Sequence, residues 1–583
     1  MKKYLPIAII CILVLSGLGA VAITDDKSVG LISETKTFGK LTLAEDEKYT
    51  TISLEKATST LMGEGVPSLP VVTEVYTFPF GTKINDVIVT FSEQHQQKIT
   101  KEIKPALVPQ YISNELVQKS SAPLTFYKNN IYPEERYSYK ASAGLYNGEE
   151  LTFLAVHYCP ISYSPSDNTL YISDSAQIEI SYDSPENPIT FSDDYDLLIL
   201  APSEFADALQ PLVDFKNDNG IPTMFTSLED IPSVGIDVQE DIKYYIKDVK
   251  ETYGITYVLL VGAGVLGEEI FPVRDAWIPS EPYEDSFPSD LYYADIYLDG
   301  GGFASWDADG DGRYCEIPDD LDAVGISPDV YIARLPCNNV GEVKDAVKKI
   351  TKFAQNNRVT NKIVQMGGDT FPGDGEGIYE GEYANAQVMN VLPGYTTRQL
   401  WASTNKLNRF NILMAMYSGV DFMDWSGHGS PVSWATHPPN DDSIWIPEGF
   451  KYTGFLYVHL YFVFNFNKLP VVVLNACSTS KFSNTANCLS WEFVKKKIGG
   501  SIATYGASGI GFGSQGSSET ERLFGWMELH LHQEFVNSGI LGNAWGDCIT
   551  NYANSFMMDD VDYKTVCEMS LFGDPSLNIG TGS

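Results

Sequence analysis

The first third of the chain alternates apolar and polar residues over short runs. Examples are residues 86–91 (Asp-Val-Ile-Val-Thr-Phe) and residues 170–172 (Leu-Tyr-Ile). Alternation with a period of two places successive side chains on opposite faces of a strand. Turn-forming sequences such as Pro79-Phe80-Gly81 and Ser164-Pro165-Ser166 separate these runs. The pattern predicts a β-rich region from about residue 24 to residue 183.

The pattern changes after Ser184-Pro185-Glu186-Asn187-Pro188, which we interpret as a linker. Beyond it, short and nearly continuous apolar runs alternate with longer segments of helical periodicity. Such runs are typical of parallel strands buried on both faces, and their alternation with helices indicates βαβ units. Strands are expected at residues 195–200, 221–226, 257–262, 329–335, 361–367, 420–426, 470–476 and 500–505, and helices at residues 203–219, 237–252, 341–356, 518–537 and 542–556.

These patterns predict an α/β fold with a mostly parallel sheet and helices on both faces, preceded by a β-rich domain. A chain of 583 residues is long enough for two or three domains. We expect a signal peptide at residues 1–22, a β-rich domain at residues 23–188, a first α/β subdomain at residues 189–358 and a second at residues 359–583.

The N-terminus has the layout of an export signal. Lys2 and Lys3 precede an apolar run at residues 5–18, and Ala20-Val21-Ala22 fits a small-residue cleavage pattern. The apolar run is short for a membrane span, and an uncleaved anchor is the competing interpretation. We expect a secreted or cell-surface protein with no stable membrane span once the signal is removed.

Acidic residues outnumber basic ones, with 76 Asp and Glu against 39 Lys and Arg, for a net charge of −37. Such a surface repels phosphate backbones, which disfavours nucleic acid as a partner. Seven of the eight cysteines lie outside the signal, and an odd number in an exported chain indicates at least one free thiol. The sequence has no Cys-x-x-Cys pair and no compact histidine spacing, so a zinc enzyme is disfavoured.

Two of the predicted strands lead to a chemically reactive side chain. The run at residues 420–426 leads to His428, and the run at residues 470–476 leads to Cys477. Sites in open α/β sheets form at the carboxyl ends of strands, where these two side chains could meet. Taken singly, such a cysteine is usually a small core residue and a His-Gly pair is usually a turn. Their pairing at two strand ends favours a nucleophilic dyad.

In that dyad the Cys477 thiolate would attack an acyl carbon to form a thioester. His428 would carry the proton to the leaving amine. Gly427 and Gly429 flank the histidine and allow a close approach of the backbone. The N–H groups of Gly429 and Cys477 are therefore the candidates for an oxyanion hole.

Three motifs resemble, in order, those of the gingipain family of cysteine peptidases. They are Gly427-His428-Gly429-Ser430, residues 475–482 (Asn-Ala-Cys-Ser-Thr-Ser-Lys-Phe) and residues 571–577 (Leu-Phe-Gly-Asp-Pro-Ser-Leu). Residues 288–293 and 330–336 resemble the same family, and Leu69-Pro70-Val71 looks like its inhibitory propeptide. The resemblance implies a caspase-like fold and a secreted endopeptidase, made as a zymogen, that acts on proteins or peptides and is inhibited by its own propeptide.

The resemblance also implies a third catalytic group, an acid that orients the histidine and fixes its tautomer. Asp369 lies 59 positions before His428 and fits this role, with a loop cap as the alternative. The interval of 49 positions from His428 to Cys477 is longer than the family pattern. The excess is an aromatic stretch at residues 447–466, which indicates an extra loop or hairpin beside the active site.

Gingipains cleave after Arg or Lys, so the resemblance implies a basic P1 residue and an acidic pocket. The carboxylate-rich segment at residues 374–382 offers Glu376, Glu380 and Glu382, and Phe512 is a candidate for an aromatic pocket wall. A solvated acidic loop is the alternative. The linker region, residues 184–192, contains no Lys or Arg, so self-cleavage there would require a broader specificity.

An Asp-x-Asp-x-Asp-Gly run at residues 307–312 predicts a structural calcium site. Alternate carboxylates converge on one hard cation, and the glycine permits a sharp turn. The loop is not a full EF-hand, because its twelfth position is Pro318, and an acidic turn without an ion is the alternative. The expected ligands are Asp307, Asp309, Asp311, the Arg313 carbonyl and Glu316, with Asp319 or Asp320 as substitutes for the last. No organic cofactor is expected.

Two other functions stay open on the sequence. A non-catalytic exported binding protein could share the fold, although both His428 and Cys477 are present. A transpeptidase or ligase would use the same thioester and resolve it with an amine in place of water.

Overall fold

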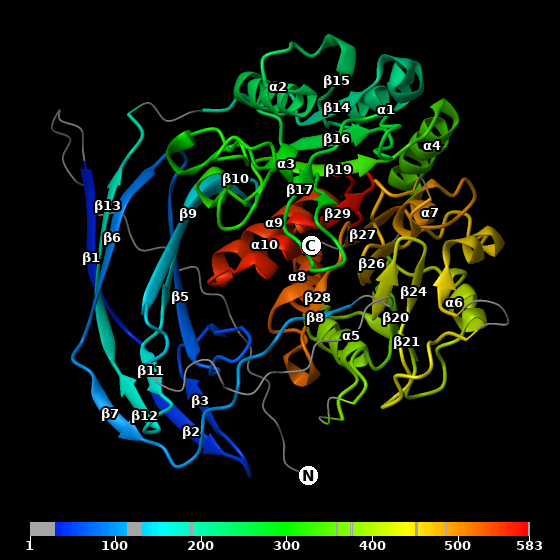
Figure 1. Ribbon diagram of the computed structural model, residues 1–583. Helices are drawn as coiled ribbons and strands as arrows, with labels where there is room; N and C mark the ends of the chain where they lie inside the picture. The colour runs from blue at the N-terminus through cyan, green and yellow to red at the C-terminus, as the bar shows by residue number, and fades with distance from the viewer. Residues whose placement is uncertain are drawn as a thin grey trace.

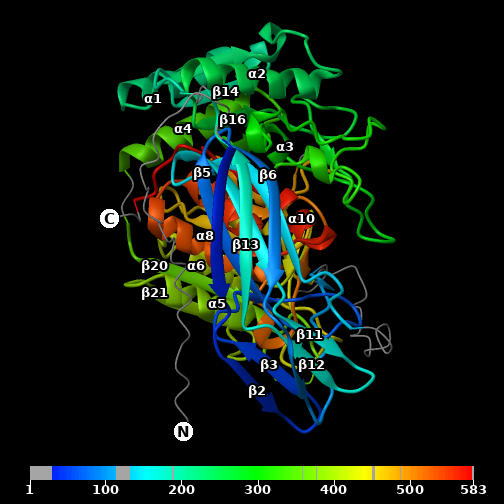
Figure 2. The same cartoon turned by 90° about the vertical axis from the view of Figure 1, so that its left-hand side faces the viewer.

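The computed structural model describes residues 29–112, 131–186, 190–356, 359–373, 375, 377–448, 453–485 and 487–580. The predicted signal peptide at residues 1–22 and Glu376 of the predicted pocket lie outside these residues. Long antiparallel strands from the N-terminal region lie along one side of a larger α/β region (Figures 1 and 2).

The N-terminal region is β-rich, as predicted, and its two main sheets pack face to face. In one sheet β13 lies between β1 and β6, and in the other β10 lies between β5 and β9. Apolar side chains that alternate along these strands form a shared core, for example Ile178 and Ile180 of β13 with Leu154 and Val156 of β10. The strands are β1 (Val29–Thr37), β5 (Pro70–Pro79), β6 (Lys83–Phe91), β9 (Tyr137–Tyr146), β10 (Glu149–Tyr158) and β13 (Ser175–Asp183), with shorter strands β2 (Leu41–Glu45), β3 (Thr50–Leu54), β4 (Ser59–Thr60), β7 (His95–Lys98), β11 (Ile161–Ser164) and β12 (Thr169–Ile172).

The α/β region is built on one sheet of ten strands in the order β15-β14-β16-β19-β29-β27-β26-β22-β20-β21. Its pairs are parallel except for β27 with β29. The predicted α/β fold with a mostly parallel sheet is confirmed. The strands are β14 (Leu197–Ala201), β15 (Thr223–Ser227), β16 (Tyr257–Val261), β19 (Tyr331–Leu335), β20 (Lys362–Gly367), β21 (Thr396–Trp401), β22 (Phe422–Ser426), β26 (Val471–Asn475), β27 (Ala503–Ala507) and β29 (Met569–Phe572).

Strand β29 joins the two halves of this sheet. It pairs with β19 of the first half and with β27 of the second half. Its four residues, Met-Ser-Leu-Phe, are too short a run to distinguish a strand from a helix by pattern, so the sequence did not predict it. The two expected subdomains therefore share one continuous sheet.

Helices cover both faces of the sheet, because its strands are apolar on both sides. In β26, Val471 and Val473 belong to one core, while Val472 and Leu474 belong to another. Two long helices near the C-terminus, α8 and α9, pack against each other close to the predicted ranges. The helices are α1 (Ala206–Asp218), α2 (Val238–Tyr253), α3 (Leu291–Ala294), α4 (Val340–Asn356), α5 (Glu380–Val391), α6 (Arg409–Met416), α7 (Leu489–Lys495), α8 (Leu523–Ser538), α9 (Leu541–Ser555) and α10 (Asp560–Cys567).

The two regions contact each other at several points. The Leu145 N–H donates to the Pro328 carbonyl at 2.8 Å, and Lys250 forms a buried ion pair with Glu150. A short strand, β8 (Gln110–Tyr111), leaves the N-terminal region and pairs with β28 (Phe512–Gly513) of the α/β region. Among the described residues, every helix is too short or too polar to cross a membrane.

Candidate active site

The ends of β22 and β26 bring His428 and Cys477 to the same edge of the sheet. The two strands are parallel neighbours, and Ser426 pairs with Asn475 at their carboxyl ends. The Gly427 N–H extends this pairing with a hydrogen bond of 3.1 Å to the Asn475 carbonyl. His428 and Cys477 each follow two positions after the Ser426–Asn475 pair, and both side chains are buried.

The Cys477 sulfur lies against the backbone of Gly511. It accepts a hydrogen bond from the Gly511 N–H at 3.0 Å, and Sγ lies 3.3 Å from the Gly511 carbonyl oxygen. Burial raises the pKa of Cys477 well above its usual range, the negative charge of Glu568 adds to this, and the Gly511 N–H opposes it. In this covered state the Cys477 side chain is therefore a thiol and not a thiolate.

A backbone carbonyl orients the imidazole of His428. Its Nε2 lies 2.7 Å from the carbonyl oxygen of Thr370. A carbonyl oxygen can only accept, so we assign the proton to Nε2, which gives Nδ1 the role of exchanging protons. The rings of Phe371 and Trp445 stand edge-on to the imidazole, with centroids at 6.1 and 5.1 Å.

Asp369, the predicted orienting acid, is buried directly before Thr370. Its backbone pairs with that of His437, through N–H to O distances of 3.1 and 3.3 Å. Its carboxylate accepts a hydrogen bond of 2.7 Å from the Asn440 N–H. These contacts fix the chain beside the Thr370 carbonyl, through which the histidine is held.

A segment of the N-terminal region lies across this site as an extended strand. Tyr111 pairs with Phe512 in the β8–β28 ladder. The next residue, Ile112, donates its N–H to the Gly511 carbonyl at 3.1 Å and accepts at 3.2 Å from the N–H of Gly429. Gly429 is one of the two predicted oxyanion donors, so the Ile112 carbonyl lies where a substrate carbonyl would bind.

The Ile112 side chain is 1% exposed and fills a pocket beside Gly513. A Cβ on Gly513 would lie 3.0 Å from Ile112 Cγ2 and 3.1 Å from Glu519 Oε2, with the Phe371 ring at 3.4 Å. Glycine is required here because any larger residue would fill the space that these groups occupy.

Two carboxyl groups lie at this pocket. Burial raises the pKa of Glu519 to about 8 and that of Glu380 to about 9. Glu380 accepts hydrogen bonds from the N–H groups of Thr370 and Phe371 at 3.1 Å each and of Gly516 at 2.9 Å. Backbone N–H donors lower both pKa values and neighbouring carboxylates raise them, and the net upward shift favours the protonated forms while the apolar Ile112 occupies the pocket.

The other predicted pocket residues have different contacts. The Glu382 carboxylate accepts hydrogen bonds from the Ser403 N–H at 2.8 Å and from the Ser403 hydroxyl at 2.5 Å. The Phe512 ring packs on Tyr111, with centroids 4.8 Å apart. The structure thus brings Glu519 next to Ile112 and places Glu380 within electrostatic reach of Glu519. It also brings Phe512 next to Tyr111, the residue before Ile112.

Comparison with known proteins identifies the family. Residues 191–580 match the family model described as peptidase family C25. The chain belongs to peptidase family C25. The resemblance to gingipains found in the sequence is therefore confirmed.

Among the similar curated C25 peptidases are two gingipains of Porphyromonas gingivalis. Gingipain R2 of strain W83 is 20% identical over 320 residues, which cover 54% of this chain and 36% of the relative. Gingipain R1 is 20% identical over 382 residues, which cover 59% of this chain and 33% of the relative. The chain thus spans about a third of the length of the curated relatives it matches.

Solved structures of gingipain R also match this C25 chain. The Arg-specific cysteine proteinase gingipain R (RgpB) is 18% identical with a TM-score of 0.48, and the match covers 68% of this chain and 80% of that one. The complex of the RgpB pro- and mature domains is 19% identical with a TM-score of 0.46, and covers 66% and 80%.

The Asp-rich loop of this C25 chain folds as a turn closed by its own hydrogen bonds. Carboxylate oxygens of Asp307, Asp309 and Asp311 lie within 4.8 Å of one another. The Asp307 carboxylate also accepts hydrogen bonds from the N–H groups of Gly310 and Gly312, whose φ angles are 76° and 85°. This convergence of oxygen ligands could hold a metal ion.

Two other predicted ligands of the loop, Glu316 and Asp320, have protein partners of their own. The Glu316 carboxylate forms an ion pair of 3.2 Å with Arg313. Asp320 accepts hydrogen bonds from the N–H groups of Ala308 and Glu316 at 2.6 and 2.9 Å, which closes the loop.

The sequence missed three groups of this C25 site. The Thr370 carbonyl and the Gly511 backbone carry no residue-type signature, since any residue supplies them. The segment ending at Ile112 is far from the motifs in sequence, and its Gln-Tyr-Ile residues have no distinctive chemistry. Glu519 falls at the start of the helix predicted at residues 518–537, whereas α8 begins at Leu523, and nothing near it in sequence indicates a pocket.

Proposed function

We propose that this chain is the zymogen of a secreted cysteine endopeptidase, with Cys477 as nucleophile and His428 as acid–base partner. The observation that carries the proposal is the position of Ile112. Its N–H and carbonyl bind Gly511 and Gly429 as the P1 residue of an extended substrate would, and the Cys477 sulfur contacts the same Gly511. Membership of peptidase family C25 supports the same chemistry.

In the proposed mechanism, the Cys477 sulfur attacks the carbonyl carbon of the P1 residue. The N–H of Gly429, with that of Cys477, stabilises the oxyanion that forms. The thiol proton passes to Nδ1 of His428 and then to the leaving amine, so the C–N bond breaks and a thioester remains. Water then attacks the thioester, gives its proton to the same nitrogen, and the thiol is regenerated as the acid product leaves.

The proposed role of Thr370 and Asp369 is to position the histidine. The Thr370 carbonyl accepts a hydrogen bond from the Nε2–H group and stabilises the imidazolium that forms during proton transfer. Asp369 acts through this carbonyl by fixing the backbone next to it.

The N-terminal β-rich domain, residues 23–188, is the proposed propeptide and inhibitor. Its Ile112 excludes water and substrate from the site, and burial keeps Cys477 protonated. Removal of the segment would hydrate the sulfur and lower its pKa, which makes the thiolate available. The signal at residues 1–22 would direct this zymogen to the outside of the cell.

Basic P1 specificity is part of the proposal. Glu519 and Glu380 lie at the Ile112 pocket, and the charged groups that act on them are other carboxylates. The aliphatic Ile112 supplies no charge, whereas an Arg or Lys side chain would bring the cation that stabilises their ionised forms. Ile112 therefore occupies the pocket as a poor substrate, which suits an inhibitor.

A calcium ion is the proposed ligand of the Asp-rich loop. The carboxylates of Asp307, Asp309 and Asp311 would hold it, with the Arg313 carbonyl and Glu316 as further ligands. Its contribution would be to stabilise the loop, with no part in catalysis.

The experiment that tests this function compares the processed enzyme with its Cys477→Ala variant on peptides with Arg, Lys, Ile or Ala at P1. The proposal expects hydrolysis of the basic peptides by the parent enzyme alone. Mass spectrometry of products formed with an added amine distinguishes hydrolysis from acyl transfer. Absence of turnover of every peptide by the processed enzyme would contradict the proposal.

A further inference from the structure

Four aromatic side chains project into solvent from the extra segment between His428 and Cys477. Tyr461, Phe462, Phe464 and Phe466 are 57%, 70%, 46% and 66% exposed. Large aromatic side chains are mostly buried in folded proteins, and a group of them at the surface marks an interaction site.

The segment that carries these rings is held firmly. The Asn465 side chain, which points inward, donates to the Gly500 carbonyl at 2.9 Å and accepts from the Gly500 N–H at 2.7 Å. The Tyr417 hydroxyl accepts from the Phe464 N–H at 3.0 Å and donates to the Phe462 carbonyl at 2.9 Å. The rings are therefore displayed by a fixed backbone.

The backbone of Phe466 contributes to this display. Its φ angle is 52°, in the left-handed region that bulky side chains rarely adopt. This backbone conformation turns the ring outward, where it gains no packing in the core.

A hollow of about 680 Å³ lies next to Phe466 and is rich in positive charge. Six lysines and two aspartates line it. Lys349 is buried and donates to the carbonyls of Val494 and Ser501, so the other five lysines supply the charge. Both aspartates have partners. Asp345 pairs with Lys497 at 3.1 Å, and Asp421 accepts hydrogen bonds from the backbone of residues 360 and 361. The lysines are Lys348, Lys349, Lys352, Lys362, Lys468 and Lys497.

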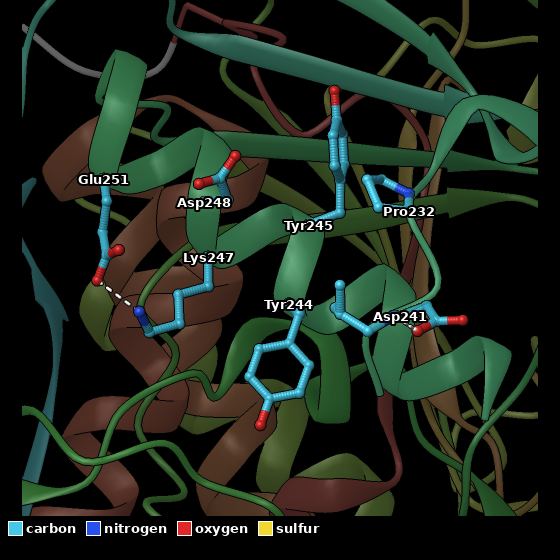
Figure 3. A pocket seen from close by; sticks show the side chains of 8 residues that line it. Pro232, Asp241, Tyr244, Tyr245, Lys247, Asp248 and Glu251 are labelled. Carbon is cyan, nitrogen blue, oxygen red and sulfur yellow. Dashed lines mark hydrogen bonds and ion pairs between the residues drawn. The ribbon is translucent and has the colours of Figure 1, made fainter. Parts of the chain in front are cut away.

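A second hollow, beside α2, has the opposite character (Figure 3). Asp241, Asp248 and Glu251 line it, and its lysine, Lys247, pairs with Glu251 at 2.7 Å. The chain has a net charge of −37, so the lysine-rich hollow is a positively charged site on an otherwise acidic protein.

We propose that the exposed rings and the lysine-rich hollow form a docking face for an anionic lipid surface. Aromatic side chains insert at the level of the lipid headgroups, and lysines beside them bind the phosphates. Lys496 lies 5.0 Å above the Phe464 ring, so charge and ring already form one surface. A soluble phosphate could bind the lysines, but it would make no contact that accounts for the four exposed rings.

This face lies far from the dyad. Leu469 and Val471, at the amino end of β26, line the hollow, whereas Cys477 follows the carboxyl end of the same strand. Docking would leave the active-site edge of the sheet directed away from the lipid. The neighbouring helices α6 and α7 also lie on the opposite side of the molecule from β1, β6 and β13 (Figure 1).

The test is co-sedimentation of the full chain, as Cys477→Ala to prevent self-cleavage, with lipid vesicles. The protein should bind phosphatidylcholine vesicles that contain roughly 30% phosphatidylglycerol and not pure phosphatidylcholine. Binding should weaken between about 0.1 M and about 1 M salt, as the screening length falls from about 10 Å to about 3 Å. The variant Phe462→Ser/Phe464→Ser/Phe466→Ser should bind roughly tenfold less or weaker still.

Charge reversal and a matched control complete the design. Lys468→Glu/Lys497→Glu should abolish binding, while Val234→Ser/Ile236→Ser, which alters residues 65% and 74% exposed beside the acidic hollow, should leave it unchanged. Melting temperatures equal to the parent's would establish that the variants fold. Equal binding by the ring variant and the control, or no binding to anionic vesicles, would overturn the proposal. Sedimentation that results from self-association, without any need for vesicles, would also overturn it. Release of the protein from the vesicles by soluble glycerol phosphate would likewise show that the lysines bind phosphate without a bilayer.

Discussion

The N–H of Gly429 donates a hydrogen bond of 3.2 Å to the carbonyl oxygen of Ile112. Gly429 follows the histidine of the proposed dyad, and Ile112 comes from the N-terminal β-rich region. Since a hydrogen-bond donor at this position would stabilise a reaction oxyanion, its occupation by a chain carbonyl means that the site is blocked by a substrate-like segment. Under the proposed function, this contact would keep the enzyme latent and would place the Ile112 side chain where the P1 side chain of a substrate binds.

The first prediction concerns the side chain in the pocket. Ile112→Arg should convert the blocking segment into a better substrate, because Arg would pair with Glu519 and Glu380 where Ile112 supplies no charge. Self-cleavage after residue 112 should become roughly tenfold faster or more. Gel analysis of the purified protein over time, with mass spectrometry of the fragments, measures this rate.

Two controls accompany this variant. Ile112→Arg/Cys477→Ala should remain intact, and Ile112→Val should be cleaved as slowly as the parent. Slower cleavage of the Arg variant than of the Val variant would mean that the pocket prefers aliphatic side chains, and the basic specificity would be wrong.

The second prediction concerns the Asp-rich loop. Calcium at 100 times its dissociation constant should stabilise the protein by about 2.7 kcal/mol, and removal by a chelator should lower the melting temperature accordingly. Asp309→Asn/Asp311→Asn should melt as the chelated parent does and stop responding to calcium. Calorimetry with and without calcium measures the effect.

Asp322→Asn is the matched control for the calcium test. Asp322 is an exposed aspartate close to the loop and outside the proposed ligand set. Its variant should keep the full response to calcium. If neither calcium nor a chelator changes the melting temperature of the parent protein, the prediction of a structural calcium site is wrong.

The third prediction concerns pH and the buried carboxyl of Glu519. Burial raises its pKa to about 8 in the folded zymogen, whereas in the unfolded chain it titrates near the usual value of 4.5. Between these values the folded state holds a proton that the unfolded state has released, so stability is greatest below pH 4.5 and falls as pH rises toward 8. The loss should be on the order of a few kcal/mol.

Glu519→Gln tests this assignment, because the amide cannot ionise. The melting temperature of this variant, in the Cys477→Ala background, should fall less steeply from pH 5 to pH 8 than that of its parent. Glu204→Gln alters an exposed residue and should follow the parent curve. If the melting temperature of the Glu519 variant falls with pH as steeply as that of its parent, Glu519 does not cause the pH dependence.

The sequence predicted those features that depend on periodicity and on neighbouring strands. Strand-like runs at residues 420–426 and 470–476 predicted parallel strands, and the ends of these strands predicted that His428 and Cys477 lie at the same edge of the sheet. This works because parallel strands must expose their carboxyl ends at one edge. The N-terminal runs predicted strands because apolar and polar residues alternate in them with a period of two.

The parts that the sequence did not predict depend on backbone groups or on long-range pairing. The Thr370 carbonyl and the Gly511 N–H could belong to any residue type. β29 is four residues long, and its place between β19 and β27 is set by tertiary packing. Within one acidic segment, Glu380 points to the pocket and Glu382 to Ser403, a difference set by helix α5 that composition does not encode.

The account depends most on Cys477 as the nucleophile, and covalent labelling tests this most directly. Processed enzyme would be treated with an irreversible peptidyl ketone inhibitor that has Arg at P1, and the modified residue identified by mass spectrometry. The account predicts a single adduct on Cys477, no adduct while residues 110–112 cover the site, and none in Cys477→Ala. Modification of another cysteine, or peptide hydrolysis by Cys477→Ala, would contradict it.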